Sequence, residues 1–167
     1  MKHLLLCTLI TLFGHTVFAQ ELVQMQIKEV KAVVVDLASD DRPARLNLEH
    51  LDKLHTNLLD PNASGDQFEA VIASWTNFHE QIVAYLDEVG FNWGVETDYV
   101  KLFHRFYFNS DGTVAYYIFK VFDEQVTEAT RESYKNHLED FLKVHPIDLK
   151  RAYLFAQCGK SSYPVSK

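Results

Sequence analysis

The sequence predicts an α+β protein in which a layer of helices packs on a small antiparallel sheet. Two patterns lead to this fold class. Amphipathic helical spacing fills much of the first half of the chain, and two aromatic, β-rich runs flank an Asp-Gly turn in the second half. Helices and strands that are segregated along a chain in this way are typical of α+β domains.

Residues 1–19 have the composition of a secretory signal peptide. Lys2 gives a positive start, residues 4–13 are mostly apolar, and Val17 and Ala19 occupy the −3 and −1 positions of a cleavage site. The apolar run is too short to cross a membrane. We therefore expect the leader to be removed and the mature protein to work in the periplasm or outside the cell.

The remaining residues, 20–167, are expected to form one α+β domain. Cleavage leaves 167 − 19 = 148 residues, and a chain of that length buries about 70% of its unfolded surface. The formal net charge is −7, without a run of basic residues. This balance argues against nucleic acid and anionic membrane surfaces as partners. Because Cys7 leaves with the leader, Cys158 has no cysteine with which to form an internal disulfide.

Residues 22–38 begin the helical part of the domain, residues 20–90, and carry conflicting signals. Three consecutive valines, Val33 to Val35, favour a strand because they are β-branched. Apolar residues nevertheless recur at helical spacing, on a stripe made by Val23, Ile27, Val30, Val34 and Leu37. We expect a helix here, followed by a loop at residues 40–43.

A short helix is predicted over residues 48–59. Asn47 precedes it as a candidate N-cap, and leucines recur at helical spacing within it. Pro61 is expected to end this helix, because the residue before a proline is pushed out of the α region. Residues 62–65 would form the turn that follows.

A longer helix is predicted over residues 66–89. Ser64 and Gln67 have the spacing of a capping box at its start, and apolar residues keep helical spacing for about six turns. Gly90 follows as the residue that ends the helix in a left-handed conformation. The two helices, joined by a short turn, are expected to form an αα-hairpin.

A β-hairpin is expected to open the second part of the domain, residues 91–167. Strands are predicted over residues 101–108 and 113–122, on either side of a turn at residues 109–112. The Asp-Gly pair in this turn, between aromatic runs, is a strong hairpin signal. Gly112 is expected to take a positive φ.

A helix and a last strand are predicted after the hairpin. Thr127 is the candidate N-cap of the helix, and Pro146 is expected to stop it. The last strand is predicted over residues 152–158, and residues 159–167 are expected to form a polar tail.

The hairpin is the main candidate for a binding surface. It carries eight aromatic side chains, and alternation places Phe106 and Phe108 on one face of the sheet and Tyr107 on the other. In a purely structural interpretation, helices would cover much of this aromatic surface. In a functional interpretation, the hairpin is an aromatic platform, or a sheet edge that receives a partner strand, a glycan or an apolar ligand. The candidate ligand-binding residues are Trp93, Tyr107, Tyr116 and Tyr117.

No pattern in the sequence predicts a metal ion or another cofactor. His79 and Glu80 lack the second histidine of the zinc-protease motif. The turn at residues 109–112 resembles the start of a calcium loop but lacks the bidentate acid that should follow. Its Asn, Asp and Gly residues are explained by turn chemistry.

Cys158 is expected to be buried against the last helix and unreactive, because a free cysteine behaves as a small apolar residue. The sequence therefore favours an exported, non-enzymatic module that binds a protein or a small ligand. The alternative is a small exported hydrolase that uses Cys158 or a pair formed by a histidine and a carboxylate.

The expected αα-hairpin, together with two segments that follow it, resembles a group of exported bacterial proteins of unknown function. The two segments are residues 105–113, Arg-Phe-Tyr-Phe-Asn-Ser-Asp-Gly-Thr, and residues 155–159, Phe-Ala-Gln-Cys-Gly. The likeness covers nearly all of the mature chain and implies no activity. The order of strands 101–122, helix 127–145 and strand 152–158 also has a topological likeness to the TonB C-terminal domain. This chain lacks the proline-rich spacer and the basic surface of that module.

Overall fold

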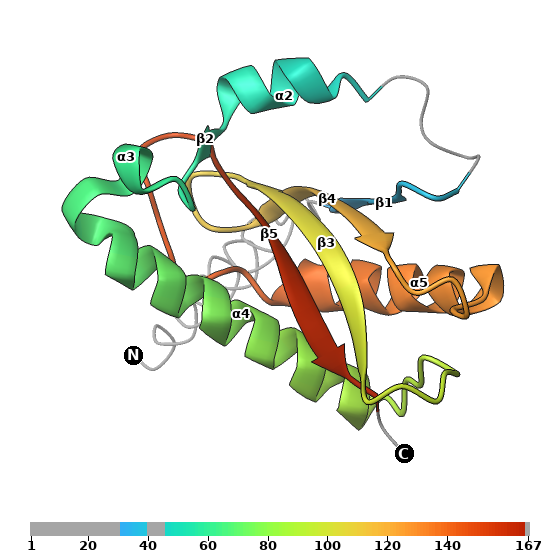
Figure 1. The fold of residues 1–167 in the computed structure, drawn as a ribbon. Helices are drawn as coiled ribbons and strands as arrows, with labels where there is room; N and C mark the ends of the chain where they lie inside the picture. The colour runs from blue at the N-terminus through green and yellow to red at the C-terminus, as the bar shows by residue number, and fades with distance from the viewer. Residues whose placement is uncertain (1–30, 40–45, 166–167) are drawn as a thin grey trace, which may run out of the picture.

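The computed structural model describes residues 31–39 and 46–165 and confirms the α+β class. Within this part of the chain, five strands form one mixed sheet in the order β1-β4-β3-β5-β2 (Figure 1). In chain order the elements are β1 (Val33–Asp36), α2 (Leu48–Leu54), β2 (Thr56–Asn57), α3 (Pro61–Ser64), α4 (Phe68–Glu88), β3 (Tyr99–Phe108), β4 (Val114–Val121), α5 (Glu128–Val144) and β5 (Phe155–Pro164).

The predicted hairpin is present, but the sheet is not purely antiparallel as expected. β3 pairs antiparallel with β4 and β5, whereas the edge strands β1 and β2 run parallel to their neighbours. The helix expected over residues 22–38 is wrong for residues 33–36, which form β1. There the three β-branched valines favour extended backbone and β4 supplies a pairing partner. Residues 22–30 lie outside the described part of the chain.

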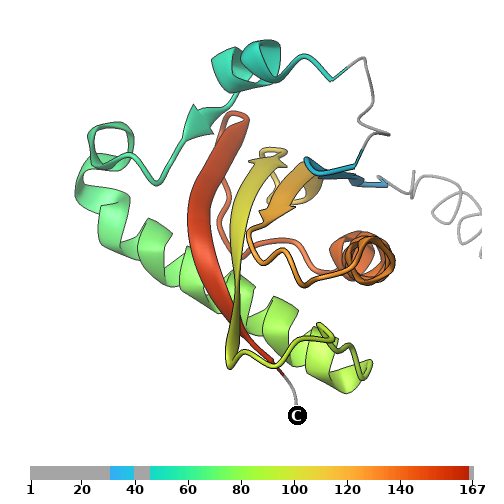
Figure 2. The same cartoon turned by 45° about the vertical axis from the view of Figure 1, so that its right-hand side comes forward.

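Helices cover both faces of the sheet. α4 and α5 pack on one face, where Phe78, Tyr134 and Phe141 join inward-facing aromatic residues of β3 and β4 in the main core. α2 lies over the other face, where Leu51 joins Tyr107 in a second, smaller core (Figure 2). Because α2 and α4 lie on opposite faces, the expected αα-hairpin is wrong.

The start of α2 is confirmed, but its end is not. The side chain of Asn47 accepts a backbone N–H of the first turn at 3.0 Å, as an N-cap does. α2 is shorter than the predicted helix 48–59, because residues 56–57 leave the helix to pair with β5. Pro61 starts the one-turn helix α3 behind the capping side chain of Asp60, a position where the missing N–H of proline costs nothing.

The long helix predicted over residues 66–89 is confirmed as α4. The expected capping box is wrong, because the hydroxyl of Ser64 donates its hydrogen bond to the carbonyl of Leu58 instead. Gly90 ends the helix as predicted, with φ +68°. The hydrogen bonds of a Schellman motif then turn the chain toward the sheet.

In the last part of the chain, the helix is confirmed and the final strand is longer than predicted. The Thr127 side chain accepts a backbone N–H at 3.1 Å, and α5 ends before Pro146. β5 covers only part of the predicted range 152–158 and continues into the predicted tail, residues 159–167. Its ten residues all pair with β3, so backbone hydrogen bonds hold a segment whose side chains are mostly small and polar.

Candidate functional site

A groove lies between α4 and the second half of β5. Its cavity volume is about 740 Å³. α4 forms one wall, residues 161–165 form the other, and the chain that follows α4 closes one end. Most of the lining is apolar or aromatic, and its principal residues are Trp75, Val83, Leu86, Phe91, Trp93 and Tyr163. A mostly apolar concave site with a few polar groups is typical of ligand-binding sites.

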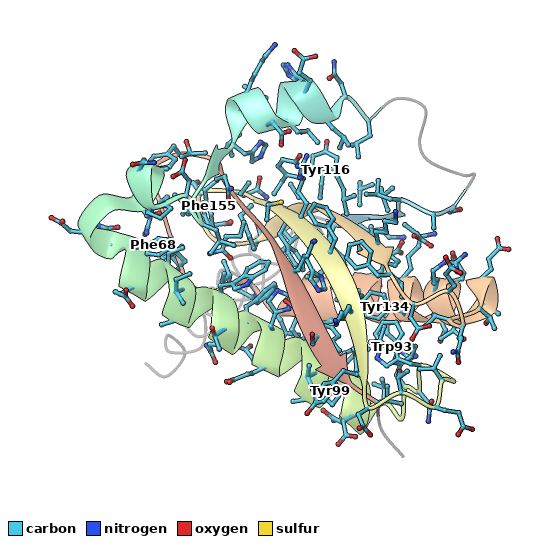
Figure 3. All side chains as sticks on the ribbon, viewed as in Figure 1. Phe68, Trp93, Tyr99, Tyr116, Tyr134 and Phe155 are labelled. Atoms are coloured by element: carbon cyan, nitrogen blue, oxygen red, sulfur yellow. The ribbon has the colours of Figure 1, made fainter. Side chains whose placement is uncertain are left out.

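Ring packing holds the aromatic walls of this groove in place. Trp75 meets the ring of His79 edge-on, with ring centroids 4.1 Å apart. Trp93 packs on Tyr134 of α5 at 4.9 Å, and Figure 3 shows these two side chains together. Trp75 also lies over Gly159, where an added Cβ would be in ordinary van der Waals contact with the indole at 3.5 Å. Both tryptophans of the chain therefore line the groove.

A buried network of two histidines and three tyrosines lies behind the groove. Nδ1 of His79 shares a hydrogen bond with the hydroxyl of Tyr163 at 2.6 Å. Nδ1 of His104 is 2.8 Å from the hydroxyl of Tyr117, which lies 2.8 Å from that of Tyr134. The two imidazole rings are 4.6 Å apart. Hydrogen bonds thus connect α4, α5 and three strands across the main core.

Burial keeps this network uncharged. Desolvation lowers the pKa of His79 from its usual 6.5 to about 3. Desolvation, together with the nearby His79, holds the pKa of His104 well below its usual value. The pKa values of the three buried tyrosines, Tyr117, Tyr134 and Tyr163, are raised well above 10, again chiefly by desolvation. At neutral pH the site therefore offers neutral imidazoles and protonated phenols.

Unpaired polar atoms gather in the same place. Among the described residues, the buried side-chain atoms without a hydrogen-bond partner are Nε2 of His79, Nε2 of His104 and both amide atoms of Gln157. Gln157 and His104 lie on neighbouring strands, opposite Phe106 and Gly159 respectively. Leaving a buried polar atom unpaired costs about 1–3 kcal/mol. Because these unpaired polar atoms are close together beside one groove, the groove differs from the rest of the core.

The structure places only one of the predicted ligand-binding residues in the groove. Trp93 lines it, although only 2% of its surface is exposed. Tyr117 belongs to the buried network, and Tyr107 is buried on the opposite face with its hydroxyl 2.7 Å from Asp52. Tyr116 is half-buried below α2 (Figure 3). These three tyrosines are not brought together with Trp93.

Apart from Trp93, sequence reasoning did not identify the residues that line the groove, and His79 and Tyr163, which join its two walls, are the clearest omissions. These two residues are separated by 84 positions along the chain, and no motif spacing links them. Tyr163 was assigned to a polar tail. The available signal for His79 was its position one helical turn after Trp75, within the amphipathic helix predicted over residues 66–89.

Cys158 does not lie where it was predicted. It is half-buried rather than buried, and it stands beside Arg105 on the sheet face that α2 partly covers, away from α5. Strand alternation explains the error, because Ala156 and Cys158 share the face opposite the main core. Four histidines, His55, His79, His104 and His145, hydrogen-bond to backbone carbonyls or tyrosine hydroxyls rather than to Cys158 or a carboxylate.

No family model, curated protein or solved structure matches this chain. Across residues 31–39 and 46–165, no helix is both long enough and apolar enough to cross a membrane. In the same residues, no three histidine, cysteine or acidic side chains are grouped as a metal ion would require.

Proposed function

We propose that this protein is an exported, non-enzymatic binding module whose ligand occupies the groove between α4 and β5. The aromatic groove is the observation that carries the proposal, since it combines Trp75, Trp93 and Tyr163 around one cavity. Large aromatic walls bury ligand surface at low entropic cost. The leader at residues 1–19 supports export.

The chemistry around the groove favours binding over catalysis. His79 and His104 are kept neutral by burial, and the pKa of His79, at about 3, is too low for a general base at neutral pH. The Nδ1 atom of each histidine is engaged by a tyrosine hydroxyl rather than by a carboxylate or a nucleophile. Of the two, only His79 lines the groove, and its neutral imidazole presents no base to a ligand there.

We expect the neutral apolar dye Nile red to bind this groove with one-to-one stoichiometry. Binding should change the intrinsic fluorescence, because both tryptophans of the chain line the cavity. The substitution Ala84→Arg puts a long side chain into the groove from an exposed position of α4. It should weaken dye binding about tenfold or more, a loss that corresponds to about 1.4 kcal/mol.

The matched control for this experiment is Ala73→Arg. Ala73 is also exposed on α4 but does not line the groove, and it lies about 16 Å from Ala84 along the helix. The affinity of the Ala73→Arg protein for the dye should stay near that of the unchanged protein. Equal binding by the Ala84→Arg and Ala73→Arg proteins, or binding without any change in tryptophan fluorescence, would contradict the proposed site.

A further inference from the structure

One edge of the sheet is unpaired directly beside the groove. β2 covers β5 only at two positions, Thr56 opposite Phe155 and Asn57 opposite Ala156. Beyond Ala156, no described strand pairs with the outer side of β5, which forms the edge of the sheet in Figure 2. The open edge runs past the residues of β5 that line the groove, Ser161 to Pro164.

The hydrogen bonds at the two ends of β5 establish which backbone groups face outward. The carbonyl of Ala156 accepts from the N–H of Leu58 at 2.9 Å, on the outer side. The N–H of Val165 donates to the carbonyl of Asp98 at 3.0 Å, on the side of β3. Backbone direction alternates along an antiparallel ladder. The N–H and C=O groups that point outward are therefore those of Cys158, Lys160 and Ser162, and no hydrogen bond within the described residues uses them.

A strand added to this edge would place alternate side chains over the groove. The residues of β5 that face α4 are those at odd positions, including Gly159 beneath Trp75 and the buried Tyr163. An extended chain beside β5 repeats this alternation. Every second side chain would then face the aromatic wall, and main-chain hydrogen bonds would hold the strand. This combination is the basis of peptide recognition by strand addition.

The charge of α4 indicates the chemistry of the occupant. α4 contains Glu69, Glu80, Asp87 and Glu88 and has no lysine or arginine. Glu80 and Asp87 are among the groove residues, so the aromatic wall carries an acidic border. Apolar and basic side chains complement such a surface, whereas acidic side chains would be repelled.

We propose that the ligand of the groove is an extended peptide segment of a partner protein, bearing apolar and basic side chains, which adds as a strand to the outer edge of β5. This inference rests on the proposed function and specifies the class of ligand. The outward backbone groups of Cys158, Lys160 and Ser162 supply the hydrogen bonds, and the wall of α4 selects the side chains.

The test uses a synthetic octapeptide in which serine alternates with valine or lysine. Fluorescence titration of the full chain should show saturable binding, and the same peptide with glutamate in place of lysine should bind more weakly. Two further peptides carry N-methyl groups, either on the serines or on the valines and lysines. Because N–H direction and side-chain direction both alternate with period two, only one of these two peptides should lose affinity, by about tenfold or more.

The identity of the affected peptide also reports the direction of pairing. In an antiparallel pair, the residues whose N–H groups face β5 are those whose side chains point away from the groove, and in a parallel pair they are those that face the groove. Methylated serines would therefore weaken antiparallel addition. An equal effect of both N-methylated peptides, or of neither, would overturn the proposal.

A pair of protein variants tests the same hydrogen bonds from the other side. Lys160→Pro removes an outward N–H from an edge strand, where proline is tolerated, whereas Lys160→Ala removes only the side chain. Lys160→Ala should bind the peptide normally, and Lys160→Pro should bind it about tenfold more weakly while retaining Nile red. If Lys160→Pro fails to fold, the N-methylated peptides decide the question.

The outcomes separate this inference from the proposed function. One possible outcome is that the protein binds the dye, that Ala84→Arg abolishes this binding, and that no peptide binds. This outcome would overturn the peptide proposal but leave the proposal of a binding groove intact. Failure of the dye to bind would count against the groove itself. Light scattering could instead show that the protein is a dimer and that the Lys160→Pro variant is a monomer. A second copy of this chain would then occupy the edge of β5, and the peptide proposal would be overturned.

Discussion

Lowering the pH from 7 to 5 is expected to reduce the free energy of unfolding by about 2 kcal/mol through His79 alone. The imidazole of His79 is buried and its pKa is lowered to about 3 by desolvation. The pKa of His104 is lowered by the same cause, reinforced by His79. The two histidines therefore act in the same direction, and the measured loss should exceed the contribution of either one.

The sign follows from proton binding in the two states. In the unfolded chain each histidine has a pKa near 6.5, so it takes up a proton as the pH falls below that value. In the folded protein His79 stays neutral until the pH approaches 3. The unfolded state therefore binds more protons between these two values. The contribution of His79 to stability is complete above about pH 6.5 and decreases as the pH falls toward 3, by about 1.4 kcal/mol per pH unit.

Urea unfolding at pH 7, 6 and 5 measures how the free energy of unfolding changes with pH. A matched pair of variants shows which histidine causes the change. His79→Gln removes the titrating group, so the slope between pH 6 and 5 should decrease by about 1.4 kcal/mol per pH unit. His50→Gln makes the same change at an exposed position of α2 and is the matched control. A slope that His79→Gln does not alter would mean that the imidazole of His79 is charged or exposed in the folded protein.

Local chemistry made much of this fold predictable. Asn47 and Thr127 cap helices because their side chains accept N–H groups only three residues away. Gly90 and Gly112 were placed correctly because a positive φ is a property of the single residue. The hairpin between β3 and β4 was visible in its turn. In each of these cases the structural cause lies within a few residues of the signal.

The errors arise where the structural cause lies far along the chain. Residues 33–36 form a strand because β4, about 80 positions later, supplies the partner. The second half of β5 is a strand because β3 pairs with it, although its own side chains resemble a polar tail. Pairing of this kind overrides local preference. Periodicity within one segment could not reveal it.

The candidate site was only partly predictable for the same reason. Trp93 was among the candidate ligand-binding residues, and it does line the groove. The groove also depends on contact between His79 of α4 and Tyr163 of β5. It therefore depends on the second half of the final strand, which lies beyond the predicted range 152–158. Without the correct length of β5, neither the second wall nor the open edge could be placed.

Replacing Gly112 by alanine is expected to destabilise the protein by about 3 kcal/mol or more, for two separate reasons. Gly112 has φ +90°, a conformation that residues with a Cβ rarely adopt. A Cβ at this position would also lie 2.5 Å from the carbonyl oxygen of Ile147 and 2.9 Å from that of Leu149. Both obstacles are backbone atoms, so rotation of a side chain cannot relieve the contact.

The cost extends beyond the turn, because the hairpin and the segment after α5 are joined there. The N–H of Ile147 donates to the carbonyl of Gly112, and the N–H of Arg151 donates to that of Ser110, each at 3.0 Å. Moving the turn to admit a Cβ would strain both hydrogen bonds and displace the chain that leads into β5. The fold therefore requires glycine at this position for close approach as well as for φ.

Gly90→Ala is the matched control, because it isolates the conformational part of this cost. Gly90 also has a positive φ, +68°, but a Cβ there would meet no atom within 4 Å. This variant should lose only about 1 kcal/mol, the usual cost of placing a Cβ in the left-handed region. Denaturant unfolding of both variants should thus give a difference of about 2 kcal/mol that comes from the contacts with Ile147 and Leu149. Equal losses for the two variants would show that the segment after α5 does not press on the turn.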